Sequence, residues 1–282
     1  MIRHLAIVLL LFATTTHAAA EPTPLADADV SLDDLHTGGE RTFYLRAYMT
    51  TTTGTNDTQI TRVVPKEAGT FSLTTKKTDD AIVFQTSMKL TIMGEMTVEQ
   101  TMTCTPSTLM PPTAIEAKMS RGNRTQQATI TISDGVAAAT LPDGEKSKME
   151  GFPPANSVTF QGLLSLLEIL PREADQAWTV AAVGEMVQMT YVEPAGNQEL
   201  ILITCVGEET LKLADKELKC TRFELKTGAK NRDITAWVSD EGLQQLLFGT
   251  DMRMTAQPME PITEDGQDAL IDVILKAVEA AE

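Results

Sequence analysis

Apolar and polar residues alternate along most of the chain, which is the pattern of β-strands with one buried face. The alternation begins at Thr42 and is clearest at 81–92, where apolar residues such as Phe84 and Leu90 alternate with polar ones. Turn-forming pairs such as Asp134-Gly135 favour antiparallel hairpins between these stretches. The pattern predicts strands at 42–49, 58–64, 69–77, 81–92, 95–105, 114–120, 126–133, 136–141, 176–183, 186–193, 198–213, 218–227, 231–238 and 251–257.

Two segments depart from the alternation and have the spacing of helices. Residues 160–170 place five leucines on a short, strongly apolar helix, and Pro171 ends it. Residues 262–281 carry one apolar stripe that includes Leu270 and Ile274, with acidic residues around it. The chain therefore predicts a β-dominated α+β fold with a short apolar helix near 160–170 and a C-terminal helix.

The N-terminus has the three parts of a cleavable secretory signal peptide, spanning residues 1–20. A charged start with Arg3 precedes nine apolar residues at 5–13, and Ala18-Ala19-Ala20 offers a small-residue cleavage site. Nine apolar residues are too few to cross a bilayer, which needs about 20. We therefore expect cleavage near Ala20, a secreted or periplasmic mature protein, and no integral membrane segment.

The rest of the chain divides into three parts. Residues 21–40 are acidic and weakly apolar, and we expect them to form a linker or a loosely packed lead-in. Residues 41–257 form the β-rich domain, and residues 258–282 form the C-terminal amphipathic helix. Charged residues, prolines and Gly151 interrupt the alternation at 144–159, which leaves open whether the β-rich part is one domain or two.

The negative charge of the chain disfavours some classes of binding partner. The formal net charge is −16 and the isoelectric point is near 4.6. Phosphate groups would be repelled by such a surface, so the composition argues against nucleic acid and against anionic lipid headgroups. We interpret the acidity as favouring solubility.

Catalytic side chains are scarce in the mature chain. Two of the three histidines lie within residues 1–20, which leaves His36, and no G-x-S-x-G motif or glycine-rich phosphate loop occurs. Adjacent acids such as Asp79-Asp80 fit solvated charges in a chain with 39 acidic residues. We expect no catalytic, cofactor-binding or metal-binding residue and no cofactor. A carboxylate-dependent hydrolase is the least favoured function.

Three cysteines, Cys104, Cys205 and Cys220, predict one disulfide and one free thiol in an oxidising compartment, and three pairings are open. A hairpin that turns at 214–217 would place Leu211 opposite Cys220. In that register Cys205 lies about 20 Å from Cys220 along the hairpin. A disulfide needs Cα atoms within about 7 Å, so this pairing would require a sharp bend.

Three motifs in the second half resemble those of uncharacterised bacterial periplasmic β-proteins. They are CVGEETL at 205–211, LKCTRFE at 218–224 and TAWVSDEG at 235–242. These proteins are similar in fold to the lipoprotein-carrier (LolA/LolB-type) group, and the resemblance covers residues 176–257. It implies a curved antiparallel sheet, a half-barrel, with helices closing its concave apolar side. It also implies lipid binding in some members.

The leading hypothesis is an exported, non-enzymatic β-protein that binds a lipid, another apolar ligand or a lipidated partner in a cavity enclosed by the sheet. Methionine adapts to irregular ligands, and many of the 14 methionines lie on or beside predicted strands. The alternative is an envelope interaction or structural protein with a filled core. The cavity would be lined by inward apolar residues, namely Phe84, Met88, Leu90, Met102, Leu163, Leu167 and Phe223.

Overall fold

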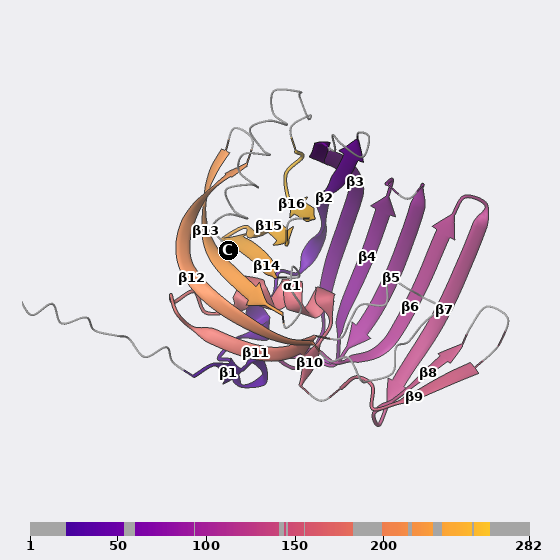
Figure 1. The fold of residues 1–282 in the computed structure, drawn as a ribbon. Coiled ribbons are helices and arrows are strands. Elements are labelled where there is room, and N and C mark those ends of the chain that lie inside the picture. Colours follow the sequence, from indigo (N-terminus) through magenta and orange to yellow (C-terminus); the bar gives the residue numbers. More distant parts are fainter. Residues whose placement is uncertain are drawn as a thin grey trace, which may run out of the picture.

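The structure, a computed structural model, describes residues 21–53, 60–92, 94–140, 144, 146–154, 156–182, 199–213, 216–227, 233–249 and 251–259. These residues form one large, curved, unclosed sheet, almost entirely antiparallel, and one α-helix (Figure 1). The predicted β-dominated α+β class and the half-barrel-like sheet are confirmed. The signal peptide, the strand at 186–193 and the C-terminal helix lie outside the described residues.

Sixteen strands join the sheet in the described part of the chain. Their bounds are β1 (Thr23–Pro24), β2 (Gly38–Thr53), β3 (Ile60–Lys77), β4 (Ile82–Leu90), β5 (Met96–Cys104), β6 (Pro112–Arg121), β7 (Arg124–Ser133), β8 (Val136–Thr140), β9 (Lys146–Glu150), β10 (Ser157–Val158), β11 (Ala177–Ala182), β12 (Glu199–Leu213), β13 (Lys216–Lys226), β14 (Ile234–Ser239), β15 (Gly242–Phe248) and β16 (Met252–Thr255).

Consecutive strands are neighbours almost everywhere, in the order β1-β11-β12-β13-β14-β15-β16-β2-β3-β4-β5-β6-β7-β8-β9. Figure 1 shows β2–β7 as a broad array, whereas β11–β13 curl around the other side of the molecule. The two parts meet where β16 pairs with β2. Strands on both sides of residues 144–159 therefore belong to one sheet. At its outer edge, β9 presents Lys146, Lys148 and Glu150, charges that disfavour pairing with another chain.

Helix α1 (Phe160–Ile169) confirms the predicted apolar helix, and it lies between the curled and the broad parts of the sheet (Figure 1). Thr159 begins it, because its Oγ1 accepts a hydrogen bond from the Gly162 N–H at 3.2 Å. Leu166 and Leu167 are completely buried. The ring of Phe160 lies 6.2 Å from that of Phe71 in β3 and 6.0 Å from that of Phe248 in β15. A helix that is apolar on nearly all sides is stable here because it is enclosed by the sheet.

The lead-in at 21–40 differs from the expected linker, because it is packed against the sheet. Leu25 in a 3-10 turn and Leu35 are buried in the main core. The acidic residues between them remain at the surface, where Asp33 forms an ion pair with Lys77. Two leucines in an otherwise polar stretch are enough to dock it, since each buried leucine contributes about 1.5–3 kcal/mol.

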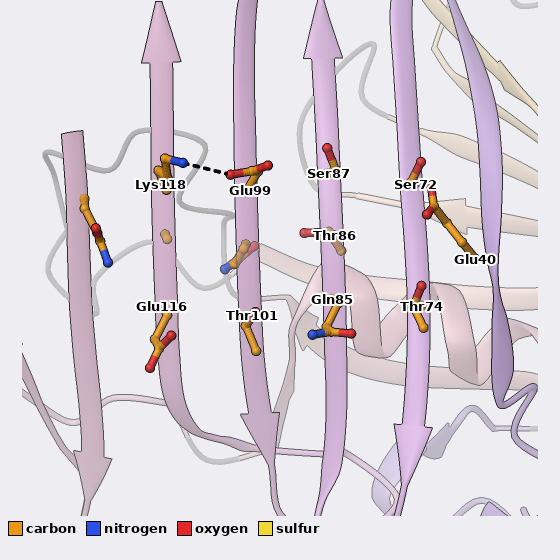
Figure 2. A pocket seen from close by; sticks show the side chains of 13 residues that line it. Glu40, Ser72, Thr74, Gln85, Thr86, Ser87, Glu99, Thr101, Glu116 and Lys118 are labelled. Carbon is orange, nitrogen blue, oxygen red and sulfur yellow. Dashed lines mark ion pairs between the residues drawn. The ribbon is translucent and has the colours of Figure 1, made fainter. Parts of the chain in front are cut away.

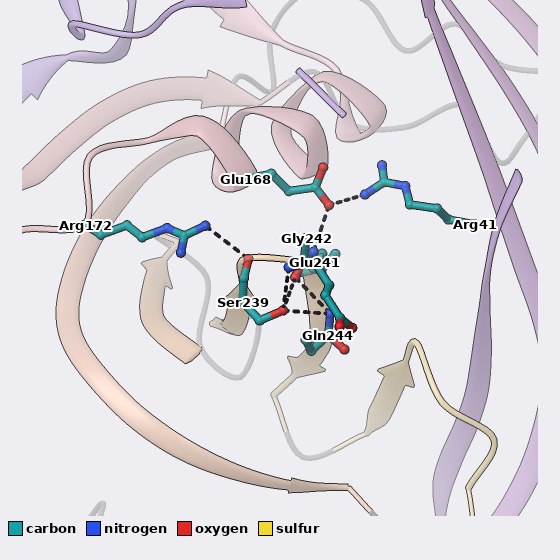
Figure 3. A network of polar contacts seen from close by, with 8 residues as sticks. Arg41, Glu168, Arg172, Ser239, Glu241, Gly242 and Gln244 are labelled. Atoms are coloured by element: carbon teal, nitrogen blue, oxygen red, sulfur yellow. Dashed lines mark hydrogen bonds and ion pairs between the residues drawn. The ribbon is translucent and has the colours of Figure 1, made fainter. Parts of the chain in front are cut away.

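A buried carboxylate fixes α1 to both halves of the sheet (Figure 3). Glu168 forms an ion pair with Arg41 of β2, and its Oε1 also accepts the Leu243 N–H of β15 at 2.8 Å. The side chain of Glu168 is 4% exposed. The carboxylate therefore connects the helix to the two strands that flank β16.

The TAWVSDEG motif forms the β14–β15 turn beside this carboxylate. Ser239 Oγ accepts the Glu241 N–H at 3.1 Å, and Arg172 donates to the Ser239 carbonyl at 3.0 Å (Figure 3). Arg172 also donates to Asp240 at 2.8 Å. Gly242 follows with φ +100°, and a Cβ there would lie 2.9 Å from Glu168 Oε1. The motif is thus a structural turn that leaves room for the buried ion pair.

We expect Gly242→Ala to destabilise the protein more than Gly38→Ala. Both glycines have φ near +100°, but a Cβ at Gly38 meets nothing within 4 Å. Gly38→Ala should therefore report only the backbone strain, about 1–3 kcal/mol. Gly242→Ala also displaces Glu168 and should cost roughly 2 kcal/mol more. Urea unfolding of both variants measures the difference, and equal losses would contradict the role of Gly242.

Candidate functional site

The seven residues predicted to line an apolar cavity are brought together, but as packed core. Phe84, Met102, Leu163, Leu167 and Phe223 are each at most 3% exposed and belong to one cluster. Met88 and Leu90 are partly buried and pack against that cluster. None of the seven lines the shallow hollow on the opposite face of β3–β7, which is described next. Whether these residues also enclose a ligand therefore stays a prediction.

A shallow hollow of about 400 Å³, which we call the polar hollow, lies on the face of β3–β7 opposite the core (Figure 2). Antiparallel pairing lines up its walls in two rows of directly opposed residues. One row is Ser72, Ser87, Glu99, Lys118 and Gln127, and the other is Thr74, Gln85, Thr101 and Glu116. Between them, the row Thr86, Gln100 and Ala117 points to the core and forms the floor.

The polar hollow is rich in hydrogen-bonding groups and acidic overall. Its described lining carries Glu40, Glu99 and Glu116 against the single cation Lys118, a balance of −2. Lys118 Nζ lies 3.4 Å from Glu99 Oε2, and both side chains are about half exposed. Hydroxyl, amide and carboxylate groups on one flat surface can bind a polar partner through several hydrogen bonds at once.

The floor of the hollow is tied to the helix behind it. Gln161 of α1 is 2% exposed and donates through Nε2 to Gln100 Oε1 at 2.9 Å. A buried hydrogen bond across the core restricts movement of β5 relative to α1. The hollow is therefore a feature of the rigid sheet and not of a loop. The alternation of the sequence predicts that these residues point outward, but alternation alone does not show that five such strands lie side by side.

All three cysteines are free and buried in the structure, so the predicted disulfide is not formed in it. The hairpin is tighter than expected, and Cys220 lies opposite Glu209 while Cys205 lies opposite Phe223. A bulge between Cys205 and Gly207 reverses which residues face the core. Cys205 therefore packs in the main core, whereas Cys220 packs on the other face with Leu211, Leu213 and Trp237.

Burial also makes these thiols poor nucleophiles. It raises the pKa of Cys104 to about 12 and that of Cys220 to about 11, and it raises the pKa of Cys205 as well. Among the residues that the structure describes, no group of three or more His, Cys, Asp or Glu side chains could hold a metal ion. His36 lies exposed in the lead-in. No helix in the described ranges is both long and apolar enough to cross a membrane.

Comparison with known families identifies the chain as a member of the DUF3108 family, described as proteins of unknown function. The match spans residues 52–253 and so includes the β14–β15 turn and every lining residue of the polar hollow except Glu40. A β-barrel-like protein of the DUF1849 family from Brucella abortus has a similar structure, with a TM-score of 0.39 and 9% sequence identity. The similarity covers 77% of this chain and 94% of that one. No curated protein matches the chain.

We expect the native protein to react very slowly with a disulfide reagent such as DTNB at pH 8. A thiol of pKa about 12 is ionised in only about one molecule in ten thousand at that pH, and burial blocks access as well. After unfolding in guanidinium without reductant, three thiols per chain should react. A count of one would show that a disulfide forms and would contradict the free state of the cysteines.

Proposed function

We propose that this DUF3108 member is an exported, non-catalytic envelope protein that binds a protein partner across the polar hollow. The observation that carries the proposal is the hollow itself, two rows of outward polar residues on five neighbouring strands. The N-terminal signal pattern supports export to the periplasm or beyond. A mature chain whose only histidine is exposed in the lead-in supports a binding role over a histidine-dependent hydrolase.

The charges of the hollow define the partner. Three carboxylates and one lysine favour a surface that offers lysine or arginine side chains together with hydrogen-bond donors. None of the described residues of the lining is aromatic, so these residues cannot stack on a sugar ring or a nucleobase. Binding of this kind weakens as salt increases, because the carboxylates are exposed and screened.

The packing of the core bears on the alternative, a lipid or another apolar ligand bound inside the sheet. That hypothesis needs space between α1 and the strands, but Leu163, Leu167, Phe84 and Phe223 are all buried in the same core cluster. The resemblance to lipoprotein carriers supports the apolar ligand, whereas the packing supports the filled core. We therefore favour the interaction protein.

We expect a photoreactive amino acid at Ser87 to form a discrete cross-linked product in cells that produce the protein with its own leader. Ser87 lies in the wall of the polar hollow. Glu99→Lys in the same chain should abolish the product, because it reverses a charge that the partner contacts. Asp79→Lys, which makes the same charge change at an exposed turn, should leave it intact.

A photoreactive residue at Asp240 is the positional control, since that side chain is fully exposed on the β14–β15 turn. The same product from Asp240 and Ser87, or none from Ser87, Thr101 and Gln127, would refute binding at the polar hollow. The Glu99→Lys variant must melt at the same temperature as the native protein, so that loss of the cross-linked product reports lost binding and not unfolding. Glu99 is about half exposed, so its replacement should not unfold the sheet.

We expect Leu167→Ala to lower the free energy of unfolding by about 2–5 kcal/mol, as for any packed core leucine. Leu200→Ala, at a position that is 63% exposed, should change it by less than about 1 kcal/mol. Organic extraction and native mass spectrometry should find far less than one lipid per protein. A stoichiometric lipid, with little loss of stability in Leu167→Ala, would favour the apolar cavity instead.

A further inference from the structure

About half of strand β12 has an open edge in the part of the chain that the structure describes. Strand β11 pairs only with Glu199–Thr204 of β12, and two backbone hydrogen bonds between Cys205 and residues 175–176 are the last contacts on that side. On its other side, β12 pairs with β13 as far as Leu213. Figure 1 shows β12 continuing past β11 along the curled part of the sheet. The backbone groups on such an edge are a template for another strand.

A bulge marks the beginning of this open edge. The pairing with β13 shifts between Cys205 and Gly207, so Val206 is the extra residue. Bulges bend a strand and increase its local twist, and the pairing with β11 ends at this one. Beyond the bulge the register with β13 is regular from Gly207 to Leu213. The open edge is therefore the side of a regularly paired strand and not a frayed end.

The side chains of the open edge alternate between two faces of the sheet. Leu211 and Leu213 are buried in the smaller of the two apolar clusters. Glu208, Thr210 and Lys212 lie on the other face, and all three are exposed. The exposed face therefore has one acid and one base, each two residues away from a central threonine.

This spacing makes the edge complementary to a second copy of itself. If two copies of β12 pair antiparallel about a twofold axis at Thr210, each Thr210 lies opposite the other. In the same register, Glu208 of each copy lies opposite Lys212 of the other, so two pairs of opposite charge form. A shift by one residue would bring opposite faces together, and a shift by two in either direction would break both charge pairs. The side chains thus favour one register.

The existing ion pair of the lysine is compatible with this contact. Lys212 Nζ lies 2.9 Å from Glu217 Oε1, and both side chains are mostly exposed. An exposed pair of this kind is weak, and one ammonium group can contact two carboxylates. Glu208 has no ion-pair partner among the residues that the structure describes. A second copy would supply one.

The other face of the same register has no steric or charge conflict. Leu213 of each copy lies opposite Gly207 of the other, where no side chain is present. Glu209 lies opposite Leu211, and its carboxylate is already 3.5 Å from Arg222 of its own chain. The Leu211 side chains of the two copies are diagonal neighbours, which are close enough for long side chains to touch. The apolar clusters of the two copies would therefore be adjacent.

We propose that the open edge of β12 is a homodimer interface, in which Gly207–Leu213 of two copies pair antiparallel about Thr210. One strand pair is a small contact beside the interfaces of about 1,200–2,000 Å² that stable complexes form. The dimer is therefore weak and depends on concentration, and the charge pairs determine its partner and register more than its strength. The interface is separate from the polar hollow and does not depend on the proposed function.

The test exchanges the two charges in the full-length protein and measures association by sedimentation equilibrium, at concentrations up to about 1 mM. The native protein should dimerise. Glu208→Lys alone and Lys212→Glu alone should each weaken association at least about tenfold, because two attractions become two repulsions. An equimolar mixture of these two variants should dimerise again, and so should the double variant, because opposite charges face each other in both.

A matched control excludes an effect of net charge alone. Asp79→Lys makes the same charge change as Glu208→Lys at an exposed turn, and it should dimerise like the native protein. Recovery in the mixture also excludes misfolding, since neither variant could then contribute a paired edge. A native protein that stays monomeric, or a mixture that associates no more strongly than its two components, would overturn the proposal.

A cysteine at the twofold axis tests the register. Thr210→Cys places two thiols opposite each other with Cα atoms about 4.5–5.5 Å apart, which a disulfide can span. Mild oxidation should therefore give a covalent dimer, and Glu208→Lys in the same chain should suppress it. The three native cysteines are buried and should not compete. Lys148→Cys in the edge strand β9 is the positional control, and equal cross-linking at positions 210 and 148 would contradict the proposed interface.

Discussion

The ion pair between Glu168 and Arg41 anchors the only α-helix among the described residues to the sheet on both sides of β16. The carboxylate belongs to α1, the guanidinium to β2, and the N–H that also reaches the carboxylate belongs to β15. A charge in this position is stable only because both partners are present, since a buried carboxylate without them costs several kcal/mol. This contact lies where the packing of α1, the turn at Gly242 and the approach of β2 to the last strands come together.

Sequence patterns were reliable for strands with one buried face and for the leucine-rich helix. They missed β15, because Gly242, Leu243, Gln244, Gln245 and Leu246 are all buried and no alternation remains to be detected. Sequence patterns also cannot distinguish an inward apolar residue that fills a core from one that lines a cavity. For Phe84 and Leu167 the difference depends on how closely α1 approaches the sheet, which no local pattern specifies.

Non-local geometry explains the other differences. The register of the β12–β13 hairpin depended on the length of its turn, and the bulge before Gly207 put Cys205 and Cys220 on opposite faces. The polar hollow was likewise not predictable. Its residues are ordinary polar residues along the chain, and they form one surface only because five strands become neighbours. The pairing of β16 with β2 is equally non-local, since more than two hundred positions separate Arg46 from its partner Arg253 in sequence.

The pairing of β16 with β2 also has a consequence for how the protein reaches its native state. Strands β2–β9 are complete long before the chain reaches Thr255, yet Tyr44–Ala47 of β2 have no partner on that side until β16 has been synthesised. An unpaired strand edge is prone to join other chains. Contacts between residues far apart in sequence also form slowly. Pairing of this edge with another chain therefore competes with the native contact until β16 has been made.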